Sequence, residues 1–295
     1  MAMTGTPTRR RPRRSLPRAL RFVPSWLFWI AIAFFVVNLL GLVGTVVVSS
    51  FGTEWFDSWL PQGWTTHYYA TAWGSFQLAD ALIVTVEVAF VVVAVGLVLG
   101  TPAAYVLARK QFPGKKLLML GFLLPIMVPP ITYGIPLATL LYKLHFGGTL
   151  TGVIIANTVP AVPFVILVLT PFVEQIDPKI ESAARMCSAN TWQIFRRILA
   201  PLMTPGLLAA ALLVLIQTVA LFELTFLVSG PGSQTLIVDL YYAVFASGIR
   251  PEQAISAMAV IYMLTTLIVL IIALRYVSPT QIVAQAKGNE EETDA

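Results

Sequence analysis

Charged residues are scarce in this chain. Asp, Glu, Lys and Arg make up 11% of its 295 residues, whereas a soluble domain carries about 25%. So few charges cannot cover a surface that faces water, which excludes an ordinary soluble domain. Hydrophobic residues make up 57% of the chain, and its mean hydropathy is +0.81. The fold must therefore be built from long apolar segments.

Cysteine and histidine are almost absent. Cys187 is the only cysteine, which rules out an intramolecular disulfide, and the only histidines are His67 and His145. A nucleophilic cysteine needs a histidine partner, and a metal site needs clustered His, Cys or Asp. The chain also lacks the glycine-rich loop that cradles nucleotide phosphates, so we do not expect it to hydrolyse ATP. We predict a non-catalytic protein that binds no metal or cofactor itself.

Six segments are long and apolar enough to cross a membrane. A bilayer core about 30 Å thick needs about 20 residues of helix, and no segment contains more than one acid. We therefore predict an all-α membrane protein with six transmembrane helices, bent in the third and fourth spans by internal prolines. The predicted spans are residues 26–50, 81–107, 117–142, 152–173, 202–228 and 254–274.

The distribution of basic residues predicts the orientation. Lys and Arg mark cytoplasmic loops, and 17 of the 19 basic residues fall in the tails and loops that are cytoplasmic if the N-terminus is inside. We expect both termini in the cytoplasm, with a basic tail at 1–25, a transmembrane domain at 26–276 and an acidic tail at 277–295. The first apolar run is too long for a signal peptide, so we expect it to be retained. The net charge of +5 is thus a sign of topology and not of nucleic-acid binding.

The predicted inner loop of residues 174–201 is too long for a simple turn. Asp177 and Pro178 indicate a helix start, with Asp as the cap and Pro at the first helical position. Apolar residues then recur at helical spacing, which predicts two short amphipathic helices. Such helices dock a partner protein or lie on the lipid surface, and amphipathicity alone leaves both possibilities open.

This loop resembles the EAA loop in permease subunits of bacterial type I ABC importers. That motif has Glu-Ala-Ala, three residues, Gly, nine residues and then Ile-x-Leu-Pro. Matching residues at the required spacing are Ala183, Ala184, Ile198 and Pro201. The likeness continues through 101–116, 123–137 and 226–249, and covers about residues 78–276.

Three positions depart from the motif. Ser182 stands at the acidic position, Ser188 at the glycine and Ala200 at the leucine. The preceding residue, Glu181, is a candidate substitute for the acid that pairs with the ATPase in this family. The other reading is that Glu181 is simply a solvated helix residue.

The resemblance implies a bacterial inner-membrane permease subunit with several partners. These are a cytoplasmic ABC ATPase dimer that carries ATP and Mg²⁺, a second permease subunit that is a distinct homologue, and an extracytoplasmic solute-binding protein. The solute is small and polar. The SGPGSQTL stretch at 229–236 and the Asp177–Pro178 start are closer to the polyamine-type branch, and TWQIFRRILAPL is also common in the sugar-importer branch. Polyamine is the expected class, with a sugar or polyol as the alternative.

Other functions fit less well. A secondary transporter usually shows inverted repeats, which the two halves lack, and it would leave the long loop unexplained. A scaffold or receptor does not need the spacing between Ala183 and Pro201.

A few polar groups fall inside the spans. An ionisable residue in a membrane helix is costly and is a functional candidate by default. Glu223, near the outer end of the fifth span, is the first candidate for a residue that faces the solute, and Asn157 and Tyr133 are weaker ones. A structural hydrogen bond between helices, or exposure at the interface, is the alternative for Glu223. For Glu87 we favour a structural role.

Overall fold

The computed structural model of the chain describes residues 25–55, 60–245 and 251–276. Helices dominate these residues, and the only extended pairing among them is an isolated bridge between Gly52 and Trp64. The all-α fold class is therefore confirmed. The basic tail, apart from its last residue, and the acidic tail lie outside the described residues.

Among the described residues, five helices are long and apolar enough to cross a bilayer, and a bent pair gives a sixth crossing if it is counted as one span. This agrees with the six predicted spans. The five are α1 (Ser25–Phe51), α3 (Leu78–Arg109), α6 (Leu150–Glu174), α9 (Ala200–Ala220) together with the short helices before it, and α12 (Glu252–Tyr276). The bent pair is α4 (Lys115–Met127) and α5 (Pro130–Lys143).

The third predicted span is broken by adjacent prolines. The axes of α4 and α5 differ by 95°. A residue before proline is pushed out of the α region, and both Val128 (ψ 131°) and Pro129 (ψ 130°) are extended. Pro130 then opens α5 at its first position, where no N–H is needed. The expected bend is present and amounts to a complete break.

The fourth and fifth spans contain features that hydropathy alone does not show. α6 continues as one helix through Pro160, Pro163 and Pro171, and the bend that we expect in this fourth span stays a prediction. We expected a continuous fifth span, but α9 stops at Leu221, whose backbone is extended (φ −78°, ψ 98°), and α10 (Phe222–Val228) follows. Periodicity does not reveal such a break, because the residues on both sides are equally apolar.

The centre of the bundle is the contact between α3 and α6. Small residues on α3, at Gly96, Gly100 and Ala104, are buried against α6. An ideal Cβ built on Gly100 would lie 2.6 Å from Val165 Cγ1. Small residues let membrane helices approach closely, and this packing is a main source of their association.

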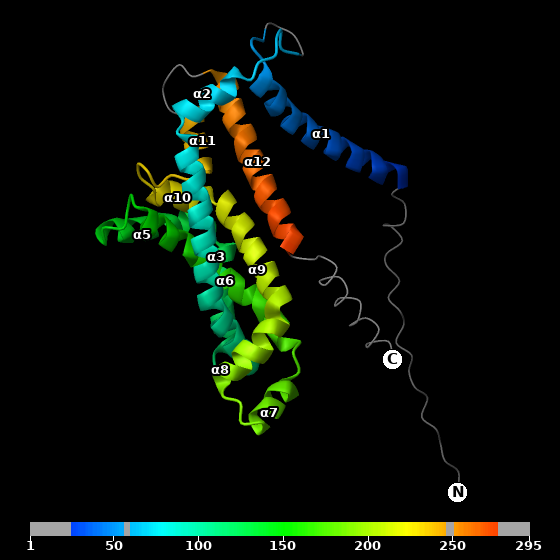
Figure 1. The fold of residues 1–295 in the computed structure, drawn as a ribbon, viewed down its shortest axis with the longest axis vertical. Coiled ribbons are helices and arrows are strands. Elements are labelled where there is room, and N and C mark those ends of the chain that lie inside the picture. Colours follow the sequence, from blue (N-terminus) through cyan, green and yellow to red (C-terminus); the bar gives the residue numbers. More distant parts are fainter. Residues whose placement is uncertain (1–24, 56–59, 246–250, 277–295) are drawn as a thin grey trace.

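The two ends of the bundle carry different short helices (Figure 1). At one end lie α2 (His67–Ser75) and α11 (Leu236–Phe245), packed beside α12. At the other end lie α7 (Pro178–Met186), α8 (Thr191–Ile194) and the π-helix η2 (Phe195–Leu199). The two short helices predicted in the inner loop are thus present.

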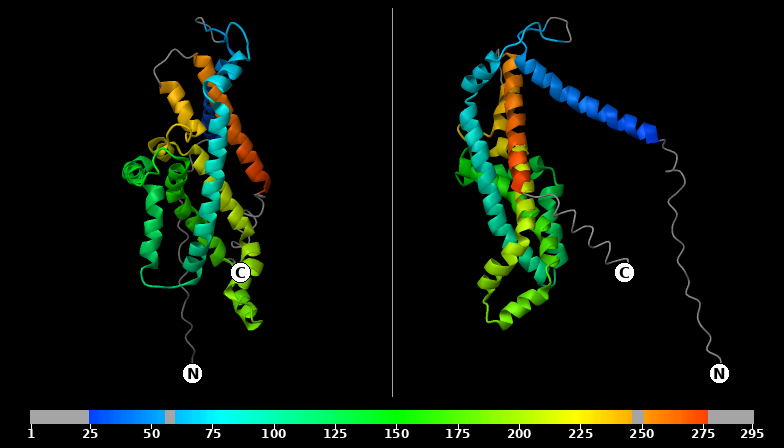
Figure 2. Two further views of the ribbon diagram at one scale, coloured as in Figure 1. Left: turned by 60° about the vertical axis from the view of Figure 1, so that its left-hand side comes forward. Right: turned by 45° about the vertical axis from the view of Figure 1, so that its right-hand side comes forward.

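The first helix stands apart from this bundle. α1 contacts α12, and its N-terminal part extends away from the other helices (Figures 1 and 2). Its large side chains are exposed, as in Trp29 and Phe34, which keep 65% and 72% of their surface. Such an apolar surface is suited to a bilayer rather than to water.

Candidate functional site

The inner loop is a folded structure with capped helices. Asp177 Oδ1 accepts a hydrogen bond from the Lys179 N–H at 2.8 Å, and Pro178 occupies the first turn of α7. Asn190 and Gln193 form a capping box at the start of α8, with bonds of 2.8 and 2.9 Å. Capping satisfies backbone donors that have no partner inside the helix. The helix start predicted at Asp177 is therefore confirmed.

Ser188 makes the turn between α7 and α8. Its φ is +61°, in the left-handed region that glycine adopts without cost. The family motif has glycine at this position, and glycine is the residue that adopts a left-handed backbone most readily. A left-handed backbone at the motif's glycine position supports this alignment of the loop with the motif.

A buried apolar cluster joins the loop to the membrane helices. Ile194, Leu199 and Met203 pack with Val173 from the end of α6, and all four are at most 2% exposed. The half-buried Ala184 of α7 packs against the same cluster. The loop therefore rests on the ends of α6 and α9 as part of one packed unit.

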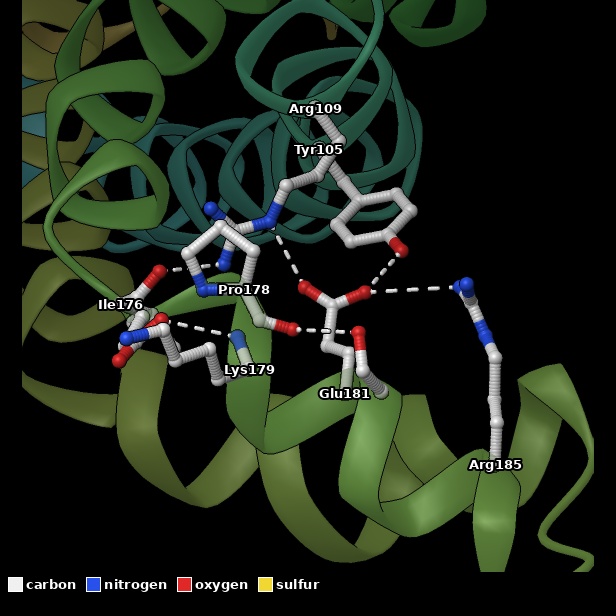
Figure 3. A network of polar contacts seen from close by, with 9 residues as sticks. Tyr105, Arg109, Ile176, Pro178, Lys179, Glu181 and Arg185 are labelled. Atoms are coloured by element: carbon white, nitrogen blue, oxygen red, sulfur yellow. Dashed lines mark hydrogen bonds and ion pairs between the residues drawn. The ribbon is translucent and has the colours of Figure 1, made fainter.

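Glu181 points into the protein and not outward (Figure 3). Its Oε1 accepts a hydrogen bond from Arg109 Nε at 2.7 Å, and its Oε2 accepts one from Tyr105 Oη at 2.7 Å. Arg185 Nη2 lies 3.7 Å from Oε2. Glu181 is only 4% exposed, so it is not the solvated helix residue that one reading of the sequence allowed. A buried carboxylate needs such charged and hydrogen-bonded partners.

Arg109 connects three segments. Besides Glu181, its Nη2 donates a hydrogen bond to the Ile176 carbonyl at 2.7 Å. Tyr105 and Arg109 stand one turn apart at the end of α3, in the AYVLAR stretch that carried part of the resemblance. Sequence reasoning did not pair them with Glu181, because they lie 76 and 72 residues away.

The other motif residues occupy more open positions. Ser182 donates a hydrogen bond to the Pro178 carbonyl at 3.2 Å and is exposed. Ala183, Ser188 and Pro201 are also exposed, and Ile198 is half-buried.

The polar candidates within the spans gather where α5, α6 and α10 meet. Asn157 on α6 donates to Thr225 Oγ1 on α10 at 3.1 Å and to the Val153 carbonyl at 2.8 Å. Asn157 Oδ1 and Tyr133 Oη are buried and have no hydrogen-bond partner among the described residues. Tyr133 packs against the apolar cluster that α5, α6 and α10 share. Burying two polar atoms without hydrogen-bond partners costs free energy, so these atoms are candidates for a functional role.

The two acids of the spans lie in different settings. The break at Leu221 puts Glu223 in the first turn of α10, where it is half-buried. Glu87 on α3 is exposed on this chain. Glu223, Tyr133 and Asn157 are therefore on neighbouring elements, and Glu87 is not on any of these.

A polar cavity of about 330 Å³ lies at the opposite end of the bundle from α7. It is lined by Asp80 at the start of α3 and by Asp239 and Tyr242 of α11, with Gln77 and Gln234. Burial raises the pKa of Asp239 to about 6. The described residues that line this cavity carry two carboxylates and no basic side chain.

Comparison with solved structures identifies the class of fold. A chain of a bacterial ABC transporter involved in import of the acidic polysaccharide alginate superposes with a TM-score of 0.71, covering 90% of this chain and 99% of that one, at 18% identity. A chain of the MetNI methionine ABC transporter superposes with a TM-score of 0.54, covering 68% and 94%, at 22% identity. The fold is that of ABC importer permeases.

The family match is direct. Residues 96–283 match the family described as binding-protein-dependent transport system inner membrane component, which is more than half of the chain. The chain belongs to this family, and with its apolar helices it is a multi-pass inner-membrane protein.

Two curated relatives carry different solutes in their names. The trehalose transport permease SugB of Mycobacterium tuberculosis is 37% identical over 138 residues, covering 47% of this chain and 50% of that protein. The sulfate transport permease CysW of Synechocystis is 33% identical over 174 residues, covering 55% and 63%. The matched stretches thus span about half to two thirds of these relatives.

Proposed function

We propose that this chain is the membrane-spanning permease subunit of an ATP-driven importer. The observation that carries the proposal is the folded and capped α7–α8 loop, which has a left-handed turn at Ser188, where the family motif has glycine. In this proposal a separate ATPase dimer binds ATP and Mg²⁺ and docks on the loop. A second permease subunit, a distinct homologue, completes the pathway. An extracytoplasmic binding protein delivers the solute.

The orientation belongs to the same proposal. With both termini in the cytoplasm, α7 and α8 face the ATPase, and α2 and α11 face the binding protein. Related support comes from an alginate transporter solved in complex with a periplasmic protein that holds an alginate pentasaccharide, at a TM-score of 0.66.

The proposed mechanism is mechanical. Closure of the ATPase dimer moves residues 182–201, and the packed helix ends transmit this movement to the bundle. The bundle then switches the side to which its central site is open. We place that site at Tyr133, Asn157 and Glu223, because two of these three carry buried polar atoms without partners among the described residues.

We propose a neutral polyhydroxylated solute of the sugar or polyol class. The polyamine expectation finds no support in the relatives named above. An oxyanion such as sulfate would meet Glu223 near the pathway and Asp80 and Asp239 in the cavity at the outer end, and like charges repel. A hydroxyl-rich solute instead offers donors to Asn157 Oδ1 and a partner to Tyr133 Oη.

The docking proposal is tested on the tagged full-length chain, purified from membranes of its host. The cytoplasmic ATPase should copurify with the wild type. Met186 at the end of α7 is 83% exposed, and Met186→Glu should lower the amount of ATPase at least tenfold. Trp64, which is 63% exposed in the connection between α1 and α2, provides the matched control, and Trp64→Glu should leave the amount unchanged.

Uptake into proteoliposomes tests the transport proposal. In vesicles that contain this chain and the second permease subunit, labelled solute should accumulate only with the ATPase, the binding protein and ATP. Uptake that persists without any ATPase contradicts the importer proposal. Uptake of sulfate in place of sugars contradicts only the solute class.

A further inference from the structure

The carboxylate of Glu181 is fully occupied inside this chain. Each of its oxygens accepts a hydrogen bond of 2.7 Å from α3, and its side chain is only 6% exposed. A carboxylate in this state has little free surface to offer to another protein. We infer that Glu181 is a positioning residue that fixes α7 to α3, and that it does not supply a charge to the ATPase. The inference rests on the proposed function and deepens it.

The side chains of Tyr105, Arg109 and Glu181 form a clamp between α3 and α7. The contacts of Arg109 extend this clamp to a third segment. The guanidinium binds Glu181 of α7 and also the Ile176 carbonyl, in the connection between α6 and α7. Figure 3 shows both contacts converging on the end of α3. The ends of α3 and α6 therefore move together with α7. The second arm of the loop, α8, passes through η2 directly into α9. A movement of the loop is transmitted to α3 and α6 through the clamp, and to α9 through a continuous helix.

Because Glu181 points into the protein, other side chains must make the contact with the ATPase. The large exposed apolar residues of α7 and α8 are Ile180, Met186 and Trp192, which keep 41%, 83% and 66% of their surface. Ser182 stands at the acidic position of the motif and cannot form an ion pair. Packing of these apolar side chains into the ATPase replaces the ion pair that the motif acid makes elsewhere in the family.

The chain contains its own probe for the clamp. Cys187 is the only cysteine, it is exposed, and it stands at the C-terminal end of α7. A nitroxide attached to it reports the motion of α7 in the full-length chain in nanodiscs, without the ATPase. The wild type should give an immobilised spectrum. Glu181→Ala should give a mobile one, and the milder Tyr105→Phe an intermediate one. Arg185→Ala should change little, because Arg185 is exposed and its nitrogen is 3.7 Å from the carboxylate.

A conservative variant separates positioning from charge donation. Glu181→Gln keeps an oxygen that accepts from Arg109 and an amide that donates to Tyr105, but it has no charge. In a positioning role it should restore the immobilised spectrum, and it should copurify the ATPase within twofold of wild type. Its ATP-driven uptake should stay within threefold, whereas Glu181→Ala should lose at least tenfold.

Two results would overturn the inference. One is an unchanged Cys187 spectrum in Glu181→Ala. The other is a loss of copurified ATPase in Glu181→Gln as large as that in Glu181→Ala, which would mean that the ATPase binds the negative charge of Glu181. If no ATPase copurifies with the wild type, the proposed function fails, while the nitroxide spectra still decide whether the clamp holds α7.

Discussion

Gly100 on α3 should not tolerate even a single added methyl group. A Cβ at this position would lie 2.6 Å from Val165 Cγ1 and 2.8 Å from Val165 Cβ, whereas carbon atoms pack at about 3.5–4.0 Å. Val165 is fully buried, and a β-branched side chain in a helix has one strongly preferred rotamer. The side chain therefore cannot turn away, and α3 must separate from α6.

The size of the effect follows from two opposing terms. Overpacking costs about 1–3 kcal/mol, and replacing glycine by alanine in a helix gains about 1 kcal/mol. We expect Gly100→Ala to destabilise the protein by up to about 2 kcal/mol. Gly96 gives the matched control on the same face one turn earlier, because its added Cβ would lie 3.5 Å from Val165 Cγ2, an ordinary contact. Gly96→Ala should be neutral or stabilising by up to about 1 kcal/mol.

Unfolding in mixed micelles with rising SDS, followed by circular dichroism, measures both variants. The midpoint should fall for Gly100→Ala and should stay or rise for Gly96→Ala. Equal midpoints for the two variants would refute the close approach of α3 and α6 at Gly100.

Three further variants test other parts of the structure. Ser188→Gly should stabilise the chain by about 1 kcal/mol, because the left-handed backbone at φ +61° costs a non-glycine residue about that much; a lower melting temperature than wild type would contradict this. Asn157→Leu and Thr225→Val should each destabilise by about 0.5–1.5 kcal/mol, and the double variant by less than their sum, because both remove the same 3.1 Å hydrogen bond. Since burial raises the pKa of Asp239 to about 6, above the unfolded value of about 4, its stabilising contribution is complete below about pH 4 and is lost as the pH rises through about 6. Between these pH values the melting temperature of the wild type should fall as the pH rises, and that of Asp239→Asn should fall less.

Local chemistry made several features predictable. The helix start at Asp177 and Pro178 follows from capping, and the break before α5 follows from Pro129 and Pro130, because each of these signals acts within a few residues. The left-handed turn at Ser188 was not predicted, since serine by itself carries no such signal.

The break at Leu221 could not be predicted in the same way. Neither proline nor glycine marks it, and apolar residues continue on both sides. Its position changed the setting of Glu223 from the end of a long span to the first turn of a short helix.

What the sequence by itself determined is the number of apolar spans, the distribution of positive charge and the helix start at Asp177 in the inner loop. These depend on composition and on spacing along one segment, which the bilayer and the helix period translate directly into structure. Only the tertiary structure decided what Glu181 does. Its partners, Tyr105 and Arg109, come from a helix more than 70 residues earlier, and an ion pair at that separation depends on how α3, α6 and α7 pack together. From the sequence, the Glu181 carboxylate was a candidate for an ion pair with a partner protein. In the folded chain it binds Tyr105 and Arg109 of the same chain.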